Sequence, residues 1–193
     1  TASHRMSATP NFFLVDPLDG TREFLRTDSS GSFTVNIGLV EHGRAVQGII
    51  FAPAFYRLCW TAFDGEHLTA CQSCNDEQSV LRVRSVPSSG PVAVASKSHL
   101  DPDTTEFLQR EDITDTLSVG SSLKFLLLAA GQADIYPRFG PTMEWDTAAG
   151  EALLRAAGGI VLSEDGTDHV YGKAGWKNAT FIACAGYHPR DFP

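Results

Sequence analysis

Two aspartates, Asp16 and Asp19, are the first candidates for chemistry in this chain. They follow four apolar residues, and the proline after Asp16 removes a backbone donor, so we predict a buried strand over residues 12–15 that ends there. Gly20 permits a close turn, and residues 21–25 have the pattern of a helix start. Carboxylates bind Mg²⁺, and backbone N–H groups at a helix start bind phosphate. We therefore predict a site for metal and phosphate. The alternative is that these residues only form an Asp-containing turn and a helix cap, which the same sequence would also allow.

A third carboxylate, Asp146, precedes an alanine-rich stretch with a helical pattern. Leu153 and Leu154 lie on its expected buried side, and the glycine pair at 158–159 is typical of a helix end. We predict that Asp146 is the N-cap residue of this helix. Helix capping alone would explain an aspartate here, so a further role for Asp146 depends on which other functional residues lie near it.

Two motifs in order, DPLDGT at 16–21 and WDTAAG at 145–150 followed by LLRAAGG, resemble those of the inositol monophosphatase family of magnesium-dependent, lithium-sensitive phosphatases. Residues 96–101, 120–125 and 136–142 resemble the bacterial 3'(2'),5'-bisphosphate nucleotidases of this family more than its inositol phosphatases. The resemblance covers most of the chain. It implies removal of the 3'-phosphate of adenosine 3',5'-bisphosphate, a by-product of sulfate activation, to give AMP and phosphate by metal-activated water.

The resemblance also implies roles for individual residues. The ligands of two or three Mg²⁺ ions would be the carboxylates of Asp16, Asp19 and Asp146 and the carbonyl oxygen of Leu18. Gly20 and Thr21 would offer N–H groups to the phosphate, and the Thr21 hydroxyl would orient the attacking water, so the catalytic residues would be Asp16, Asp19 and Thr21. The nucleotide would be contacted by His99, Ser121, Lys124, Arg138 and Asp146.

Several alternatives remain open at this point. Another phosphatase of the same family would act on inositol monophosphate or a sugar bisphosphate, and a non-catalytic phosphate-binding fragment would keep the fold without turnover. A haloacid-dehalogenase phosphatase also carries Asp-Gly-Thr after a strand. That mechanism needs a nucleophilic Asp two residues before the second one, and Pro17 occupies this position.

The resemblance implies further elements before the first motif: two helices, a hairpin, and carboxylates that bridge metals and assist the base. No Asp or Glu precedes Asp16. We expect a chain that begins at Thr1 to bind magnesium and nucleotide weakly and to turn over at least ~1000-fold more slowly than a complete enzyme. We also expect apolar surface to be exposed on its antiparallel sheet.

Composition limits the partners. The net charge is −8 and the pI near 5.1, which argues against general nucleic-acid binding because no basic stripe is available. No apolar run approaches the roughly 18 residues of a membrane span, and residues 1–10 lack a signal core. Four cysteines are too few for a disulfide framework, and the single CxxC at 71–74 does not indicate zinc. We predict a cytoplasmic protein with a small nucleotide substrate and no membrane span, and leave homodimerisation open.

We predict two domains in an α+β and α/β fold: residues 1–88 as an antiparallel sheet, and 89–193 as an α/β layer that completes the site. Strands are expected at 32–40, 45–52, 56–63 and 67–71. Residues 75–86 are polar with weak alternation and are left unassigned, and a linker is expected at 87–91. Beyond the linker we expect helices at 101–110 and 121–130 and after Asp146, and extended segments at 92–95, 115–119, 133–136, 160–162 and 180–185. The family resemblance implies the layered αβαβα sugar-phosphatase fold, with its N-terminal helices missing here.

Overall fold

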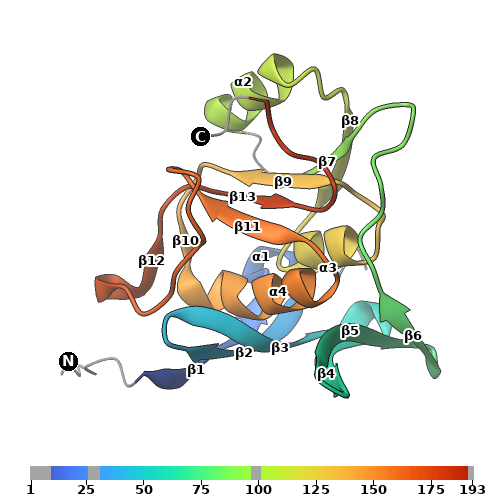
Figure 1. The fold of residues 1–193 in the computed structure, drawn as a ribbon, viewed down its shortest axis with the longest axis vertical. Coiled ribbons are helices and arrows are strands. Elements are labelled where there is room, and N and C mark those ends of the chain that lie inside the picture. The colour runs from blue at the N-terminus through green and yellow to red at the C-terminus, as the bar shows by residue number, and fades with distance from the viewer. Residues whose placement is uncertain (1–9, 26–30, 97–100, 191–193) are drawn as a thin grey trace.

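The computed structural model describes residues 10–25, 31–96 and 101–190. Its first part is a six-stranded antiparallel sheet in sequence order, β1 to β6 (Figure 1). The strands are β1 (Asn11–Asp19), β2 (Thr34–Glu41), β3 (Arg44–Ala52), β4 (Arg57–Asp64), β5 (His67–Cys74) and β6 (Glu77–Leu81). Short helices, α1 (Thr21–Phe24) and the 3-10 turn η1 (Pro53–Phe55), follow β1 and β3. The predicted antiparallel meander is confirmed.

The first strand differs from its prediction. It is an edge strand whose side chains alternate between the two faces of the sheet: Leu14 is buried, but Phe13 and Val15 are 67% and 50% exposed. It also continues past Pro17 to Asp19, with an irregular register between Asp16 and Asp19. An edge strand tolerates proline because one side of its backbone has no ladder partner. The strand predicted over 12–15 is present within β1, but the prediction that it is buried was wrong.

The two faces of the six-stranded sheet differ in how deeply their side chains are buried. On β2 the buried residues are Thr34, Asn36, Gly38 and Val40, while the apolar residues between them are only half-buried. The outer face exposes Phe13, Ile49 and Leu58, and a shallow groove of about 230 Å³ runs among these side chains. The apolar sheet surface expected from the sequence is present.

The strand β6 was missed. No strand was assigned within residues 75–86, which are polar with weak alternation, but β6 pairs with β5 from Cys74↔Glu77 onward. The turn between the two strands is Asn75-Asp76, both with positive φ (51° and 67°). Asn and Asp are the residues that adopt this conformation most readily in two-residue hairpin turns, so this pair was the available signal.

The second part is a five-stranded mixed sheet in the order β11-β13-β9-β7-β8. Its strands are β7 (Val92–Ser96), β8 (Asp115–Val119), β9 (Ile135–Arg138), β11 (Ile160–Ser163) and β13 (Phe181–Cys184). Its helices are α2 (Pro102–Arg110), α3 (Leu123–Ala129) and α4 (Glu144–Ala156). The small strands β10 (Thr142–Met143) and β12 (Lys177–Asn178) pair with each other, and the 3-10 turn η2 (Ala174–Trp176) precedes β12.

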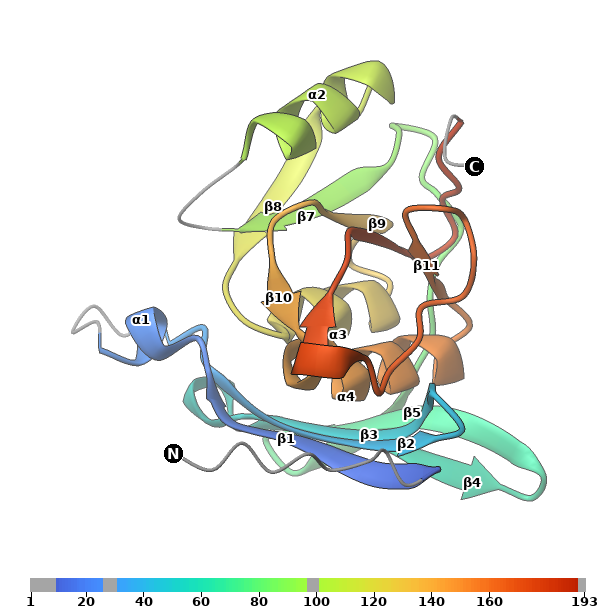
Figure 2. The same cartoon turned by 90° about the vertical axis from the view of Figure 1, so that its left-hand side faces the viewer.

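The elements stack in layers: the six-stranded sheet, then α3 and α4, then the mixed sheet, then α2 (Figures 1 and 2). One core cluster joins Ile50 of β3 to Leu126 of α3 and Leu153 of α4. A second packs Phe125 and Leu128 on the mixed sheet, and a third packs Phe107 of α2 on the opposite face of that sheet. The chain therefore has the layered fold that was predicted, and the domain division at residue 88 stays a prediction.

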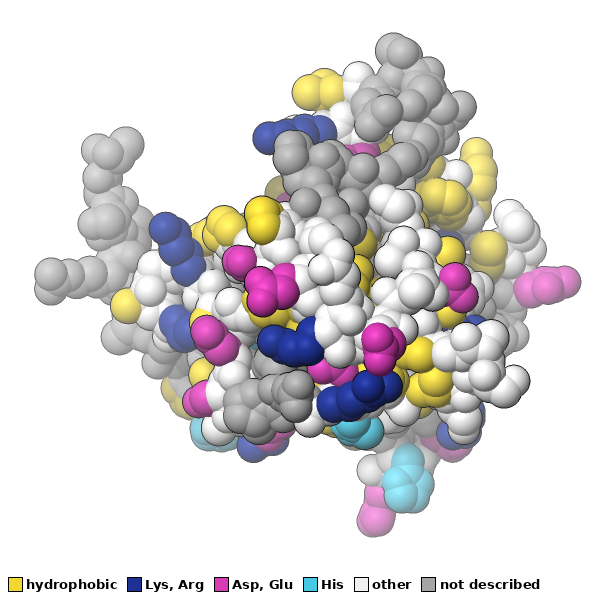
Figure 3. All heavy atoms as spheres, turned by 90° about the horizontal axis from the view of Figure 1, so that it is seen from above, with side chains coloured by type: hydrophobic (Ala, Val, Ile, Leu, Met, Phe, Trp, Pro, Cys, Tyr) yellow, Lys and Arg dark blue, Asp and Glu magenta, His cyan; other side chains and the backbone are white. Residues whose placement is uncertain are grey.

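No helix in the described part of the chain is long and apolar enough to cross a membrane. The face seen in Figure 3 shows acidic and basic side chains interspersed, without a continuous basic stripe. The four cysteines are free thiols.

Candidate active site

The end of β1 forms a turn that only glycine fits. Gly20 has φ +85°, and a Cβ at this position would lie 2.8 Å from the Ser32 carbonyl oxygen and 3.3 Å from the Ser121 Cβ. The turn is therefore pressed against the segment before α3. Asp16 Oδ1 accepts a hydrogen bond from the Leu18 N–H at 2.9 Å, which fixes the direction of its carboxylate.

Asp146 occupies a different helical position from the one predicted. It is the third residue of α4, and Met143 is the N-cap, so the N-cap prediction was wrong. The Asp146 carboxylate reaches back and accepts a hydrogen bond at Oδ2 from the Met143 N–H, at 2.8 Å. A carboxylate at this position satisfies a donor at the helix start and still presents its second oxygen outward.

The three aspartates of the two motifs meet. Asp16, Asp19 and Asp146 each offer a carboxylate oxygen, and these oxygens all lie within 4.8 Å of one another. Burial raises the pKa of Asp146 to about 6 and raises that of Asp19, and the mutual repulsion of the carboxylates acts in the same direction. Half-buried like charges at this spacing need a counter-charge. An all-oxygen set of carboxylates is the donor type that Mg²⁺ prefers, so these residues fit the ion that the sequence predicts.

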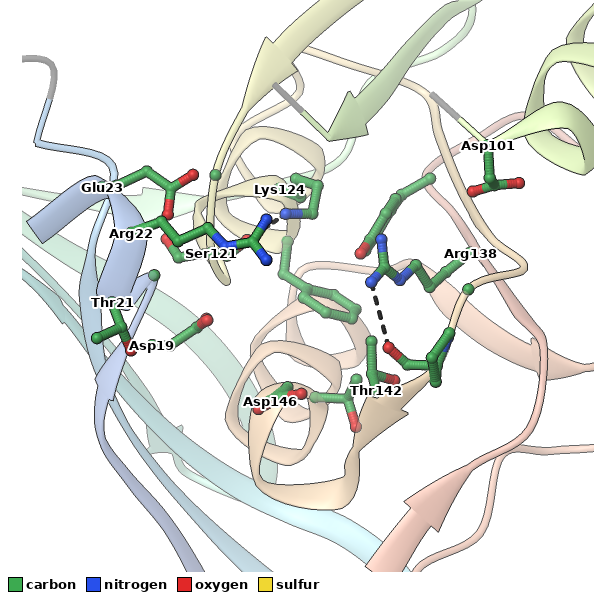
Figure 4. Close-up of a pocket in the computed structure, with 17 residues that line it drawn as sticks. Asp19, Thr21, Arg22, Glu23, Asp101, Ser121, Lys124, Arg138, Thr142 and Asp146 are labelled. Atoms are coloured by element: carbon green, nitrogen blue, oxygen red, sulfur yellow. Dashed lines mark hydrogen bonds between the residues drawn. The ribbon is translucent and has the colours of Figure 1, made fainter. Parts of the chain in front are cut away.

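Two of these carboxylates, Asp19 and Asp146, line a pocket of about 510 Å³ between the two sheets. Figure 4 shows Asp19 and Thr21 on one side of it, Asp146 below, and Arg138 across from Asp19. The lining residues come from the first motif and α1, from the N-cap of α2, from the segment before α3 and α3 itself, from β9 and the residues after it, and from the start of α4. They are Asp19, Gly20, Thr21, Arg22, Glu23, Asp101, Gly120, Ser121, Lys124, Phe125, Tyr136, Arg138, Gly140, Pro141, Thr142, Asp146 and Thr147.

Lys124 is buried in the pocket wall. Its ammonium group donates to the Ser121 carbonyl at 2.7 Å and lies 5.4 Å from the centroid of the Tyr136 ring. Burial lowers the pKa of Lys124 to about 8, opposed by attraction to Asp19. Lys124 thus places a positive charge in the pocket wall, close to the carboxylate cluster.

Arg138 has spare donor capacity. One terminal nitrogen donates to the Pro141 carbonyl at 3.3 Å, but the buried Nε has no hydrogen-bond partner among the described residues. Buried donors without a partner are rare, and a functional site is one common reason for them. The guanidinium group therefore has donor capacity that the described residues do not use.

The remaining predicted residues lie as follows. The Thr21 hydroxyl is 3.4 Å from the Leu18 carbonyl oxygen, so these two candidate groups are neighbours at the turn. Ser121 lines the pocket in a left-handed conformation with φ 51°. His99 lies outside the described residues.

Arg22 is a pocket residue that the sequence analysis did not select. It is exposed and lines the pocket, and Figure 4 shows its guanidinium group directed toward Ser121 and Lys124. Among the residues the structure describes, it has no ion-pair partner. Its position directly after Thr21 was the only signal in the sequence.

The model of the inositol monophosphatase family matches residues 2–188. The chain belongs to this family. It is 46% identical over 150 residues to the 3'(2'),5'-bisphosphate nucleotidase CysQ of Salmonella typhimurium, a match that covers 78% of this chain and 58% of that protein. It is 39% identical over 180 residues to CysQ of Buchnera aphidicola, covering 91% of this chain and 64% of that protein. The chain thus spans less than two thirds of the length of these relatives.

Two solved structures of the inositol monophosphatase family superpose well. CysQ from Bacteroides thetaiotaomicron gives a TM-score of 0.78 at 37% identity, over 93% of this chain and 71% of that one. An inositol monophosphatase from Zymomonas mobilis gives 0.73 at 27% identity, over 96% of this chain and 69% of that one. The fold predicted from the two motifs is confirmed.

Proposed function

We propose that this chain contributes the metal and nucleotide site of a magnesium-dependent 3'(2'),5'-bisphosphate nucleotidase. The observation that carries the proposal is the arrangement of charge in one pocket: the Asp16, Asp19 and Asp146 cluster opens into it, and Arg138 lies on the side opposite Asp19. A ligand with two phosphates could place one at each end. The similarity to CysQ proteins over most of this chain supports the same substrate class.

The residues at the acidic end have distinct tasks in this proposal. The three aspartates would hold Mg²⁺, which when bound would neutralise charge on the phosphate that is cleaved. The first N–H groups of a helix have no acceptor within it, so those at Gly20 and Thr21 can donate to a phosphate oxygen. The Thr21 hydroxyl, beside the Leu18 carbonyl, would orient the attacking water. The number of ions and the binding of cations by the Leu18 oxygen are part of the proposal.

At the other end, Lys124 and Arg138 would balance the second phosphate. Arginine suits this task because its guanidinium group can make paired charge-assisted hydrogen bonds to phosphate. A substrate with one phosphate would leave this end unpaired, so both residues favour a bisphosphate over inositol 1-phosphate. Homodimerisation and a cytoplasmic location also stay predictions.

The test is phosphate release by the protein in its complete form from adenosine 3',5'-bisphosphate and from inositol 1-phosphate. We expect turnover that requires Mg²⁺, and a loss on the order of 100-fold or more in Asp19→Asn. Asp64→Asn is the matched control, because Asp64 is exposed and outside the pocket. Undiminished turnover in excess chelator, or in Asp19→Asn, would overturn the assignment.

The substrate class is tested with Arg138→Ala. Each charge-assisted contact is worth about 1.5 to 3 kcal/mol, so the variant should lose roughly 10-fold or more in kcat/KM for the bisphosphate. The monophosphate should be affected much less. Equal losses for both substrates would show that Arg138 supports the fold, and would remove the argument for a bisphosphate.

A further inference from the structure

A buried polar cluster lies directly behind the first-motif turn. Its members are Thr34 and Asn36 on the inner face of β2 and Ser122 at the N-cap of α3, and they are 0%, 1% and 2% exposed. Burying three polar side chains beside a carboxylate is costly unless every group is paired. The donor and acceptor of each hydrogen bond in this cluster therefore indicate the role of its residues.

The proton on each group can be assigned. The Ser122 hydroxyl donates to Asn36 Oδ1 at 2.7 Å, and the Asn36 amide nitrogen donates to Asp19 Oδ2 at 3.3 Å. Thr34 Oγ1 lies 2.7 Å from Ser122 Oγ. A hydroxyl has a single proton, and Ser122 uses its own on Asn36, so Thr34 must be the donor in this pair. The result is a one-way chain from Thr34 through Ser122 and Asn36 to Asp19.

The chain ends on one particular oxygen. Asp19 Oδ2 also accepts the Ser122 backbone N–H at 2.7 Å, and Thr34 Oγ1 lies 3.4 Å from it. Oδ2 is thus occupied by donors from two elements, β2 and α3. The other oxygen, Oδ1, receives no hydrogen bond from the described residues, so it is the Asp19 oxygen that remains available to a cation.

We propose that Thr34, Ser122 and Asn36 are positioning residues that hold Asp19 Oδ2 so that its second oxygen is presented to a divalent cation. This rests on the proposed function, because it assumes that the aspartate cluster binds the ion. Partners of a metal ligand fix its orientation, and their loss commonly costs 10- to 100-fold in metal affinity. The cluster also makes the site depend on both halves of the chain, since β2 and α3 lie 86 residues apart at Asn36 and Ser122.

The experiment is calorimetric titration of the purified protein with Mg²⁺ and with Mn²⁺, alongside urea unfolding without metal. Thr34→Val removes the first donor at nearly constant volume, and Thr34→Ser keeps it, so these two form a matched pair. Ser122→Ala breaks the chain in its middle. We expect Thr34→Val and Ser122→Ala to weaken the cation roughly 10-fold or more, with Thr34→Ser within about 3-fold of wild type.

The outcomes separate the two proposals. Unchanged cation affinity in Thr34→Val and Ser122→Ala, with only the stability lowered, would show that the cluster is structural and overturn the positioning role. Equal loss in Thr34→Ser and Thr34→Val would do the same, because the hydroxyl would then not matter. A wild-type protein that, in its complete form, binds the cation but does not hydrolyse the bisphosphate would contradict the proposed function alone. A wild-type protein that binds neither cation would overturn both.

Discussion

Gly48 of β3 and Ala149 of α4 are in such close contact that a Cβ on residue 48 would stand 2.3 Å from the Ala149 carbonyl oxygen. Its partner on the neighbouring strand, Gly38, approaches Ala148 of α4 in the same way, since a Cβ on residue 38 would lie 2.8 Å from the Ala148 Cβ. The paired glycines form a flat place on the sheet where the helix rests. Because α4 carries Asp146 and β1 carries Asp16 and Asp19, this contact sets how closely the two motifs can approach.

Gly48→Ala should therefore destabilise the protein by about 1 to 3 kcal/mol, the usual cost of forcing extra volume into a packed interior. Urea unfolding measures the change. Gly140→Ala is the control, because its nearest neighbour would be an Arg138 side-chain atom at 3.7 Å, an ordinary contact. A Gly48→Ala protein as stable as Gly140→Ala would show that the helix can move away without cost.

His169 gives the protein a pH-dependent stability. It is 2% exposed, and its Nε2 lies 3.1 Å from Asn178 Oδ1, an acceptor, so Nε2 carries a proton. Burial lowers its pKa to about 4, from 6.5 in an exposed histidine. The unfolded chain takes up this proton near pH 6.5 and the folded chain only near pH 4. This contribution to stability is therefore complete above pH 6.5 and is lost as the pH falls toward 4.

Between pH 7 and pH 4.5 this loss should amount to about 2 to 3 kcal/mol. The measurement is urea unfolding at both pH values for the wild type and for His169→Gln, which keeps a neutral N–H donor. The variant should lack this part of the pH dependence, and the difference between the two proteins isolates His169 from the other titrating groups. Identical pH dependence in both would contradict the assignment of a neutral, buried ring.

Arg22 should contribute to nucleotide binding. It is exposed at the pocket and directed toward Lys124, so a phosphate there would gain a charge-assisted hydrogen bond. We expect Arg22→Ala to raise KM for adenosine 3',5'-bisphosphate roughly 10-fold, with kcat within about 3-fold, since exposed charge pairs sit at the low end of the usual range. Arg110→Ala is the control, because Arg110 is a partly exposed cation on α2 outside the pocket. A large drop in kcat with unchanged KM would show that Arg22 acts on the chemical step instead.

The sequence by itself determined the local features of this protein. Strands β2 to β5, β7 and β8 and the helices α2 and α4 follow from short-range periodicity and end signals. Asp101 caps α2, since its Oδ1 accepts a hydrogen bond from the Thr104 N–H at 2.8 Å. The two motifs also identified three carboxylates that the fold brings together. These features depend on residues within a few positions of one another, so the chain encodes them directly.

The tertiary structure decided what depends on neighbours far along the chain. Alternation in β2 shows that one face is apolar, but the layer of α4 packs on the other face, where Gly38 makes room and Thr34 and Asn36 are buried. Phe13 and Val15 of β1 are likewise exposed because they lie on the face of the sheet opposite α4, which the apolar run 12–15 does not reveal. The Ser122 N–H meets Asp19 across 103 residues of sequence. Such contacts form only when whole layers pack. Almost every residue has a backbone N–H, so the residue type does not indicate which acceptor that N–H will bind.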